Sequence, residues 1–235
     1  MAPNAAKCKI MNIGGGKRTY SLLDRDGKRA ILTNTSEERD LGIILTPDFK
    51  FSAQAAHCAS KASSIFGMLK RTFMSRDVEI WKSLYRTYIR PQLEFAVSSW
   101  NPFLKRDIST IEKVQRRITR LPTPLKGLSY EERCERMKLT TLEERRRRGD
   151  LIQLYKIRKE TDNVNWVCKP VWSTSRGPKR EQLRREIVSS CQTRHNFFLN
   201  RIANSWNALP NDIVESDTVE LFKKRLDEHM SRRLL

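Results

Sequence analysis

The stretch FSAQAAHCASKASSIFGMLKRTF, residues 51 to 73, spaces its apolar side chains three and four positions apart, which is the spacing of one face of an α-helix. The side chains of this face are Ala55, Ala59, Ala62, Phe66 and Leu69, and Ile65 and Phe73 broaden it. The residues before Phe51 follow a different pattern. The stretch therefore marks the beginning of a helical region.

The residues before Phe51 have the composition and turn signals of short β-strands. The predicted strands are Cys8–Ile13, Tyr20–Leu23, Ala30–Leu32 and a more buried Asp40–Leu45. Asp24–Gly27 is a turn signal, so the second and third strands should form a hairpin. Pro47 should end the last strand, because proline cannot donate a hydrogen bond to a sheet.

The residues after Phe73 continue the helical spacing. Ser75 is a suitable N-cap for a second helix, which Pro91 should kink or end near Ile89. Its predicted apolar face is Val78, Trp81, Leu84, Tyr85 and Tyr88. Asp107 can cap a third helix, which runs to Pro122. The apolar stripe of that helix is Ile108, Ile111, Val114, Ile118 and Leu121.

Two S/T-x-x-E patterns predict the beginnings of two further helices. Ser129 with Glu132, and Thr141 with Glu144, can each form a capping box in which side chain and backbone satisfy each other. The second box should open a helix from about Leu142 to Arg158. That helix carries Leu151, Leu154 and Tyr155 on its apolar side.

The last third of the chain alternates irregular and helical segments. We expect Thr161–Pro178 to be a loop ordered by Trp166 and Trp172, and the basic segment Arg180–Thr193 fits helix and strand equally well. A helix is predicted in Asn196–Ala208, with Phe198, Ile202 and Trp206 at helical spacing. Ser216 or Asp217 should cap a last helix that buries Val219, Phe222 and Leu226.

Together these patterns predict an α+β fold that is mainly α. A small antiparallel hairpin or sheet at the N-terminus should precede a helical bundle and C-terminal helices. The predicted segments are residues 1–50, rich in strands, 51–160, helical, 161–195, a basic linker, and 196–235, helical again.

The charge of the chain indicates the class of its partners. The 235 residues include 46 Lys and Arg against 27 Asp and Glu, a formal net charge of +19. Such a charge favours polyanions, above all RNA or DNA, over an anionic membrane surface. The longest uncharged stretches are ten residues, about half of the roughly 20 that a membrane-spanning helix requires. No signal-peptide core is visible and the five cysteines are scattered, so we expect an intracellular protein, nuclear or cytoplasmic.

The candidate nucleic-acid contacts are the densest basic positions. They are Lys70, Arg71, Arg116, Arg117, Arg120, Arg145, Arg146, Arg147 and Arg148. We expect these side chains to face solvent, because the apolar stripes of their helices are intact. Guanidinium groups bind phosphate as planar forks, and each neutralised phosphate releases counterions. The alternative is a solvated surface whose arginines pair with Glu112, Glu143 and Glu144.

Other patterns give weaker signals, and we predict no cofactor, no metal site and no catalytic residue. Gly14–Lys17 lacks the spacing of a phosphate-binding loop and fits a hairpin loop better. Cys191 with His195, and His57 beside Cys58, do not supply the four ligands of a structural zinc site. Trp81, Trp100 and Trp206 could stack on bases, but their helical spacing favours a place in the core.

Five successive blocks of sequence resemble the carboxy-terminal part of reverse transcriptases from jockey-type non-LTR retrotransposons. The blocks are ERDLGIILTPDFKFS (38–52), RPQLEFAVSSWNPF (90–103), IEKVQRRITRL (111–121), LSYEERCERMKLTTLEERRRRGDLIQLYKI (128–157) and FFLNRIANSWNALPNDIV (197–214). The resemblance covers the chain from about Lys7. It implies that residues 1–50 correspond to the end of the palm and residues 51–160 to a thumb-like domain.

The chain departs from this family in two respects. Where relatives commonly have histidine after the KFS segment, this chain has Gln54, with His57 three positions later. The sequence also contains no adjacent pair of aspartates, whereas the family holds its two catalytic metal ions with a palm aspartate and a YxDD-type turn. We therefore expect no polymerase activity from this chain alone.

Two classes of function follow from the resemblance and the charge. In the first, the chain is a fragment of an RNA-directed DNA polymerase that keeps a basic surface for RNA or an RNA–DNA duplex. In the second, it is a reused interaction or scaffold protein whose basic face binds an acidic protein partner. Restoration of an active polymerase by a separate palm chain is less favoured, because the divided sheet would have to re-form between two chains.

Overall fold

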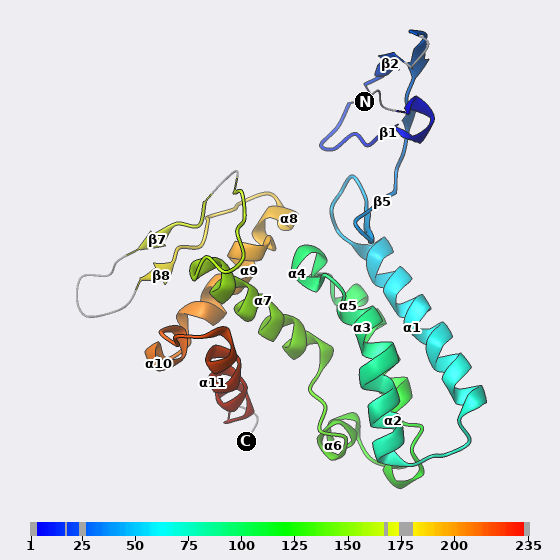
Figure 1. Ribbon diagram of the computed structural model, residues 1–235, viewed down its shortest axis with the longest axis vertical. Helices are drawn as coiled ribbons and strands as arrows, with labels where there is room; N and C mark the ends of the chain where they lie inside the picture. Colours follow the sequence, from blue (N-terminus) through cyan, green and yellow to red (C-terminus); the bar gives the residue numbers. More distant parts are fainter. Residues whose placement is uncertain (1–3, 17, 24–26, 167–168, 174–180, 233–235) are drawn as a thin grey trace.

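The structure, a computed structural model, describes residues 4–16, 18–23, 27–166, 169–173 and 181–232. Short strands lie near the N-terminus and helices make up most of the rest, which confirms an α+β fold that is mainly α (Figure 1). The N-terminal strands are β1 (Lys9–Ile10), β2 (Ser21–Leu23), β3 (Arg29–Ile31), β4 (Thr33–Asn34), β5 (Glu38–Asp40) and β6 (Ile43–Leu45), after a 3₁₀ turn η1 (Ala5–Lys7).

The predicted hairpin of the second and third strands is confirmed. Strands β2 and β3 pair antiparallel, with Ser21 opposite Ile31, and their turn at residues 24–26 lies outside the described residues, as does Lys17. Strands β1 and β4, however, pair in parallel, with Lys9 opposite Thr33. The intervening hairpin returns the chain beside β1 in the same direction, so the expected antiparallel sheet is wrong for this pair.

The expected single strand Asp40–Leu45 is instead part of a tight hairpin of β5 and β6. Leu41 and Gly42 both have positive φ angles, 45° and 88°, which reverse the chain between Asp40 and Ile43. Gln54 fixes this hairpin to the first helix, because its Oε1 accepts a hydrogen bond from the Ile44 N–H at 2.8 Å. The glutamine therefore has a structural role at the position where the resembling family commonly has histidine.

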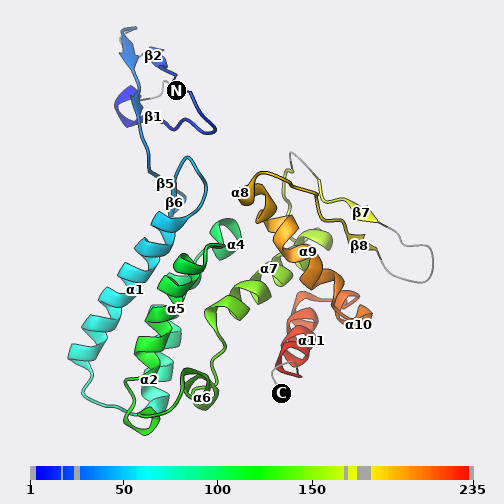
Figure 2. The same ribbon diagram turned by 180° about the vertical axis from the view of Figure 1, so that it is seen from behind.

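The N-terminal strands have little buried surface. Among the described residues before Phe51 only Ile44 is buried, and Leu23 and Ile31 are 63% and 72% exposed. Strands β1 to β4 project away from the helices in both views (Figures 1 and 2), whereas β5 and β6 lie at the beginning of α1. We expect backbone amides of β1 to β4 to exchange with solvent much faster than those of helix α5 (Lys105–Thr119), because few packed side chains oppose local opening. Hydrogen exchange followed by mass spectrometry measures this. Slow exchange in β2 and β3 would instead indicate a partner or second copy on these strands.

The first group of helices follows the predicted order. It comprises α1 (Ser52–Thr72), α2 (Val78–Leu84), a π-helical turn η2 (Tyr85–Ile89), α3 (Arg90–Glu94), α4 (Val97–Trp100), α5 (Lys105–Thr119), a 3₁₀ turn η3 (Thr123–Leu125) and α6 (Tyr130–Arg136). All five residues of the predicted α1 stripe are buried, whereas Phe73 and Tyr88 are exposed. Helices α1 and α5 pack along each other, and together they supply nearly half of the buried side chains of the first core.

Three local predictions in this group need correction. The N-cap of α2 is Asp77, whose carboxylate accepts from the Ile80 N–H at 3.0 Å, and Ser75 instead accepts from the Asp77 N–H. Of the two outcomes predicted at Pro91, a kink or an end, the end near Ile89 does not occur. The chain forms a π-helical turn before Pro91, with the Arg90 N–H bonded to the Tyr85 carbonyl, and continues as α3.

The third correction concerns Asp107. Helix α5 already begins at Lys105, so Asp107 lies in its first turn rather than at its N-cap. Its carboxylate is buried and accepts a hydrogen bond from Ser52 Oγ at 2.6 Å, which joins the beginnings of α1 and α5.

Both predicted capping boxes are confirmed. The Ser129 and Thr141 side chains accept from the N–H groups of Glu132 and Glu144, and the glutamates accept in return. Helix α7 (Leu142–Arg158) has the predicted bounds and lies between the two halves of the helical part (Figure 1). Its Leu142 belongs to the first core, whereas Leu151 and Tyr155 belong to a second core.

The second core is built from the C-terminal third of the chain. Its elements are β7 (Trp172–Ser173), β8 (Gln182–Leu183), α8 (Gln192–His195), α9 (Phe198–Asn207), α10 (Asn211–Val214) and α11 (Val219–Arg232). The segment Arg180–Thr193, for which the sequence favoured neither helix nor strand, contains strand β8 and the first residues of α8. Phe198, Ile202 and Trp206 are buried as predicted. The cap of α11 is Thr218, whose Oγ1 accepts from the Leu221 N–H at 3.2 Å, rather than Ser216 or Asp217.

Buried tryptophans stabilise both cores. Trp81, Trp100 and Trp206 have no exposed surface, which confirms the core interpretation and excludes base stacking in this conformation. Trp166 and Trp172 are half-buried against the second core, as predicted, but Trp172 lies in strand β7 rather than in a loop. Residues 167–168 and 174–178 of the predicted loop lie outside the described residues. No helix in the described ranges is both long enough and apolar enough to cross a membrane.

Candidate nucleic-acid interface

Helix α5 presents one face that carries basic side chains and no acidic ones. The exposed charged residues of the helix and of its C-cap, Arg120, are Lys105, Arg106, Lys113, Arg116, Arg117 and Arg120. The two acidic residues of this helix, Asp107 and Glu112, are buried. The separation follows from the helical spacing, because Ile111, Val114 and Ile118 turn the remaining positions outward.

Most cations of this face are available to a ligand. Among the residues that the structure describes, Lys113, Arg117 and Arg120 make no ion pair, and Arg106 contacts Asp107 at 3.6 Å. The Arg116 guanidinium lies over the ring of Tyr130, 4.6 Å from its centroid. Such a cation–π contact orients the guanidinium without neutralising it.

Lys70 and Arg71 lie at the same end of the bundle as Arg116 and Arg120. Helices α1 and α5 run in the same direction, because Ser52 and Asp107 meet near their beginnings and the Thr123 N–H donates to the Arg76 carbonyl beyond their ends. Both Lys70 and Arg71 are exposed. The predicted contacts on α1 and α5 therefore gather near one end of the first core.

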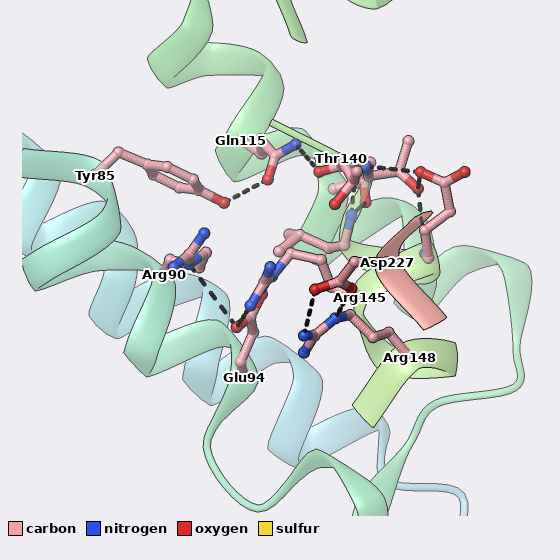
Figure 3. A network of polar contacts seen from close by, with 12 residues as sticks. Tyr85, Arg90, Glu94, Gln115, Thr140, Arg145, Arg148 and Asp227 are labelled. Carbon is pink, nitrogen blue, oxygen red and sulfur yellow. Dashed lines mark hydrogen bonds and ion pairs between the residues drawn. The ribbon is translucent and has the colours of Figure 1, made fainter. Parts of the chain in front are cut away.

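The run from Arg145 to Arg148 has a different environment from the one that we expected. Arg145 forms a bidentate pair with Glu94 of α3, in which Nη2 lies 2.9 Å from Oε2, and Arg148 forms one with Asp227 of α11, in which Nη2 lies 2.8 Å from Oδ2 (Figure 3). The partners lie 51 and 79 residues away in the sequence. They are not the neighbouring Glu112, Glu143 and Glu144 that the alternative interpretation named.

Only Arg147 of this run is exposed. Arg146 is 2% exposed, and Arg145 and Arg148 are partly buried. Four consecutive positions of a helix point in four directions, and α7 is covered by the first core on one side and by the second core on another. The expectation that the whole run faces solvent is therefore wrong, and Arg145 and Arg148 hold α7 against α3 and α11 through their ion pairs.

A further ion pair that the sequence did not signal joins α7 to α4 and α9. Arg201 of α9 binds Asp150 through both oxygens, at 2.8 and 2.9 Å, and its Nη2 donates to the Ser98 carbonyl at 2.6 Å. Asn101 donates to the same carboxylate at 3.1 Å. Asp150 is 2% exposed, so this ion pair is buried where the two cores meet and joins them.

A buried polar network holds the beginning of α7 against α5. Glu112 accepts hydrogen bonds from the Tyr130 hydroxyl and, at 3.2 Å, from the Leu142 N–H. Gln115 accepts from the Tyr85 hydroxyl and donates to the Thr140 carbonyl at 3.0 Å, as Figure 3 shows in part. Every one of these contacts satisfies a buried polar group, so the network specifies how the helices pack.

The pKa shifts in this region follow from burial and pairing. Burial raises the pKa of Glu112, an effect that the hydrogen bond from Tyr130 opposes, and burial together with Glu112 raises the pKa of Tyr130. Burial lowers the pKa of Arg146. Burial also acts to lower the pKa of Arg145, but the hydrogen bond and charge of Glu94 outweigh it, so the net shift is upward.

No residues come together as a metal site within the described ranges, where no three of the His, Cys, Asp and Glu side chains are placed to hold an ion. Comparison of the chain with protein-family models, with curated proteins and with solved structures found no match. The resemblance to reverse transcriptases therefore depends on the sequence blocks quoted above.

Proposed function

We propose that this chain binds RNA or an RNA–DNA duplex through the exposed face of α5 and does not polymerise DNA on its own. The observation that carries the proposal is the composition of that face, which has six cations and no acidic side chain. The resemblance of the sequence to the thumb-like part of a non-LTR retrotransposon polymerase also supports RNA or an RNA–DNA duplex as the ligand. The lack of an adjacent aspartate pair supports the proposal that the chain does not polymerise DNA on its own.

The physical basis of binding is release of counterions from phosphates. Each cation that neutralises a phosphate frees condensed counterions, which gives affinity without sequence readout. Arginine suits this role because its planar fork can donate two hydrogen bonds to one phosphate. Arg117 and Arg120 have no competing acidic partner in the described structure, so binding requires no ion pair to be broken at these positions.

The variant Arg116→Gln, Arg117→Gln and Arg120→Gln tests the proposed surface. We expect binding to an RNA hairpin to weaken by about tenfold or more at roughly 0.1 M salt, and the slope of log affinity against log salt to fall by about 0.7 to 0.9 per lost phosphate contact. Fluorescence anisotropy over a range of salt concentrations measures both quantities. All three side chains are exposed, so the fold should not change.

A matched control removes the same charge elsewhere. Lys159, Lys169 and Lys224 are exposed and lie outside the first core, and replacing them with glutamine should change the slope much less. A wild-type affinity that does not vary with salt would contradict nucleic-acid binding and favour an acidic protein partner. Equal effects of the two triple variants would show that net charge, rather than the α5 face, determines affinity.

A further inference from the structure

A polar cavity of about 410 Å³ lies between α5, α7, α9 and the segment that joins α4 to α5. Its charged lining residues are Arg146, Arg147, Arg201, Glu143, Glu144 and Asp150. The cavity is separate from the exposed face of α5, because the only α5 residue that lines it is Ile108.

Arg146 is the unusual member of this lining. It is 2% exposed, and both terminal nitrogens, Nη1 and Nη2, are buried without a hydrogen-bond partner in the described chain. Burying a guanidinium without hydrogen-bond acceptors is strongly unfavourable. Natural proteins therefore keep a buried guanidinium where some acceptor satisfies its N–H groups.

Three acidic side chains near Arg146 use their oxygens elsewhere. Asp150 binds Arg201 and Asn101, and Glu144 accepts from the N–H and hydroxyl of Thr141. Glu112 accepts from Tyr130 and Leu142. The charges of Glu112, Glu143, Asp150 and Glu94 act on Arg146 through space, but none of these carboxylates gives its terminal nitrogens a hydrogen bond.

We propose that this cavity binds a phosphate group, with Arg146 and Arg147 as the two guanidinium ligands. Arg147 is the neighbouring cavity arginine that is exposed and has no ion-pair partner in the described residues, whereas Arg201 is committed to Asp150. A phosphate offers several charged acceptor oxygens, so one group can complete the donors of Arg146 while it also contacts Arg147. The site goes beyond the proposed function, because it would take free phosphate whether or not α5 binds RNA.

Inorganic phosphate titrated into the purified full chain tests this site. Isothermal titration at constant ionic strength, with chloride as the balancing anion, should show saturable binding of one phosphate per chain. Arg147→Gln should weaken it by about tenfold or more, the usual range for losing one charge-assisted contact. Glu143→Gln should strengthen it, because Glu143 is an exposed cavity carboxylate that repels the anion.

Arg146→Met should abolish phosphate binding without unfolding the chain, because it replaces an unsatisfied charge with a flexible apolar side chain. Circular dichroism checks the fold, and if this variant does not fold, the opposite effects of Arg147→Gln and Glu143→Gln decide the question. Arg136→Gln on α6 is the control, since Arg136 is exposed and does not line the cavity.

A second experiment shows whether the cavity binds the phosphate at the end of a nucleic acid or only free phosphate. A short oligonucleotide with a 5′-phosphate should bind more tightly than the same oligonucleotide with a 5′-hydroxyl if the site accepts the end of a nucleic acid, and equally if it accepts only free phosphate. This difference should disappear in Arg147→Gln and persist in the α5 triple variant. Absence of saturable phosphate binding by the wild-type chain, or binding unchanged in both arginine variants, would overturn the proposal.

Discussion

Replacing Asp150 with alanine is expected to lower the free energy of unfolding by about 3 to 5 kcal/mol. The variant leaves Arg201, whose side chain is 16% exposed, without its carboxylate at the boundary between the two cores. The remaining acceptors of Arg201 are the Ser98 and Asn196 carbonyls, which do not neutralise its charge. Urea denaturation followed by circular dichroism measures the change.

A second variant, at Asp227, shows whether the loss of stability comes from the burial of the ion pair or simply from its presence. Asp227 also forms a bidentate pair, with Arg148, but its side chain is 52% exposed. Replacing Asp227 with alanine should therefore change the free energy of unfolding by only about 0 to 1 kcal/mol. Similar small losses for both variants would show that the Asp150–Arg201 pair does not hold the two cores together.

Replacing Arg145 to Arg148 together with glutamine should lower the free energy of unfolding by about 2 to 4 kcal/mol, because it removes two bidentate pairs that anchor α7. One pair joins α7 to α3 through Glu94, and the other joins it to α11 through Asp227 (Figure 3). Loss of Arg146 should contribute little to this sum, because that side chain has no hydrogen-bond partner to lose.

Single variants within the run provide the control. Arg145→Gln should account for about 1 to 3 kcal/mol, since Glu94 is only 21% exposed and would lose its bidentate partner. Arg147→Gln should alter stability by no more than about 0.5 kcal/mol, because Arg147 is exposed. If the fourfold variant is as stable as the wild-type chain, the run is a surface feature and the structural role assigned to it here is wrong.

Several features of the region around α7 could be predicted from the sequence. The bounds of α7 and both capping boxes were predicted correctly, because they depend on residues three or four positions apart. The basic face of α5 was also predictable, since its apolar stripe fixes which positions turn outward. The caps of α2 and α11 were misplaced by one or two residues, because several residues near each beginning could act as the cap.

The environment of the arginines could not be predicted in the same way. Arg145 and Arg148 resemble the surface arginines of α5 in sequence, and their partners Glu94 and Asp227 follow no local spacing. The hairpin at Leu41–Gly42 was missed because three apolar residues after it fit a longer strand equally well. Gln54 fixes that hairpin from a neighbouring helix, which no strand pattern reveals.

By itself the sequence determined the class of the fold, the order of its helices, the large positive charge and the basic face of α5, because each depends on composition or on neighbours within one or two helical turns. Only the tertiary structure decided which arginines are available to a ligand. Burial and pairing depend on which elements meet at α7, and those elements come from distant parts of the chain.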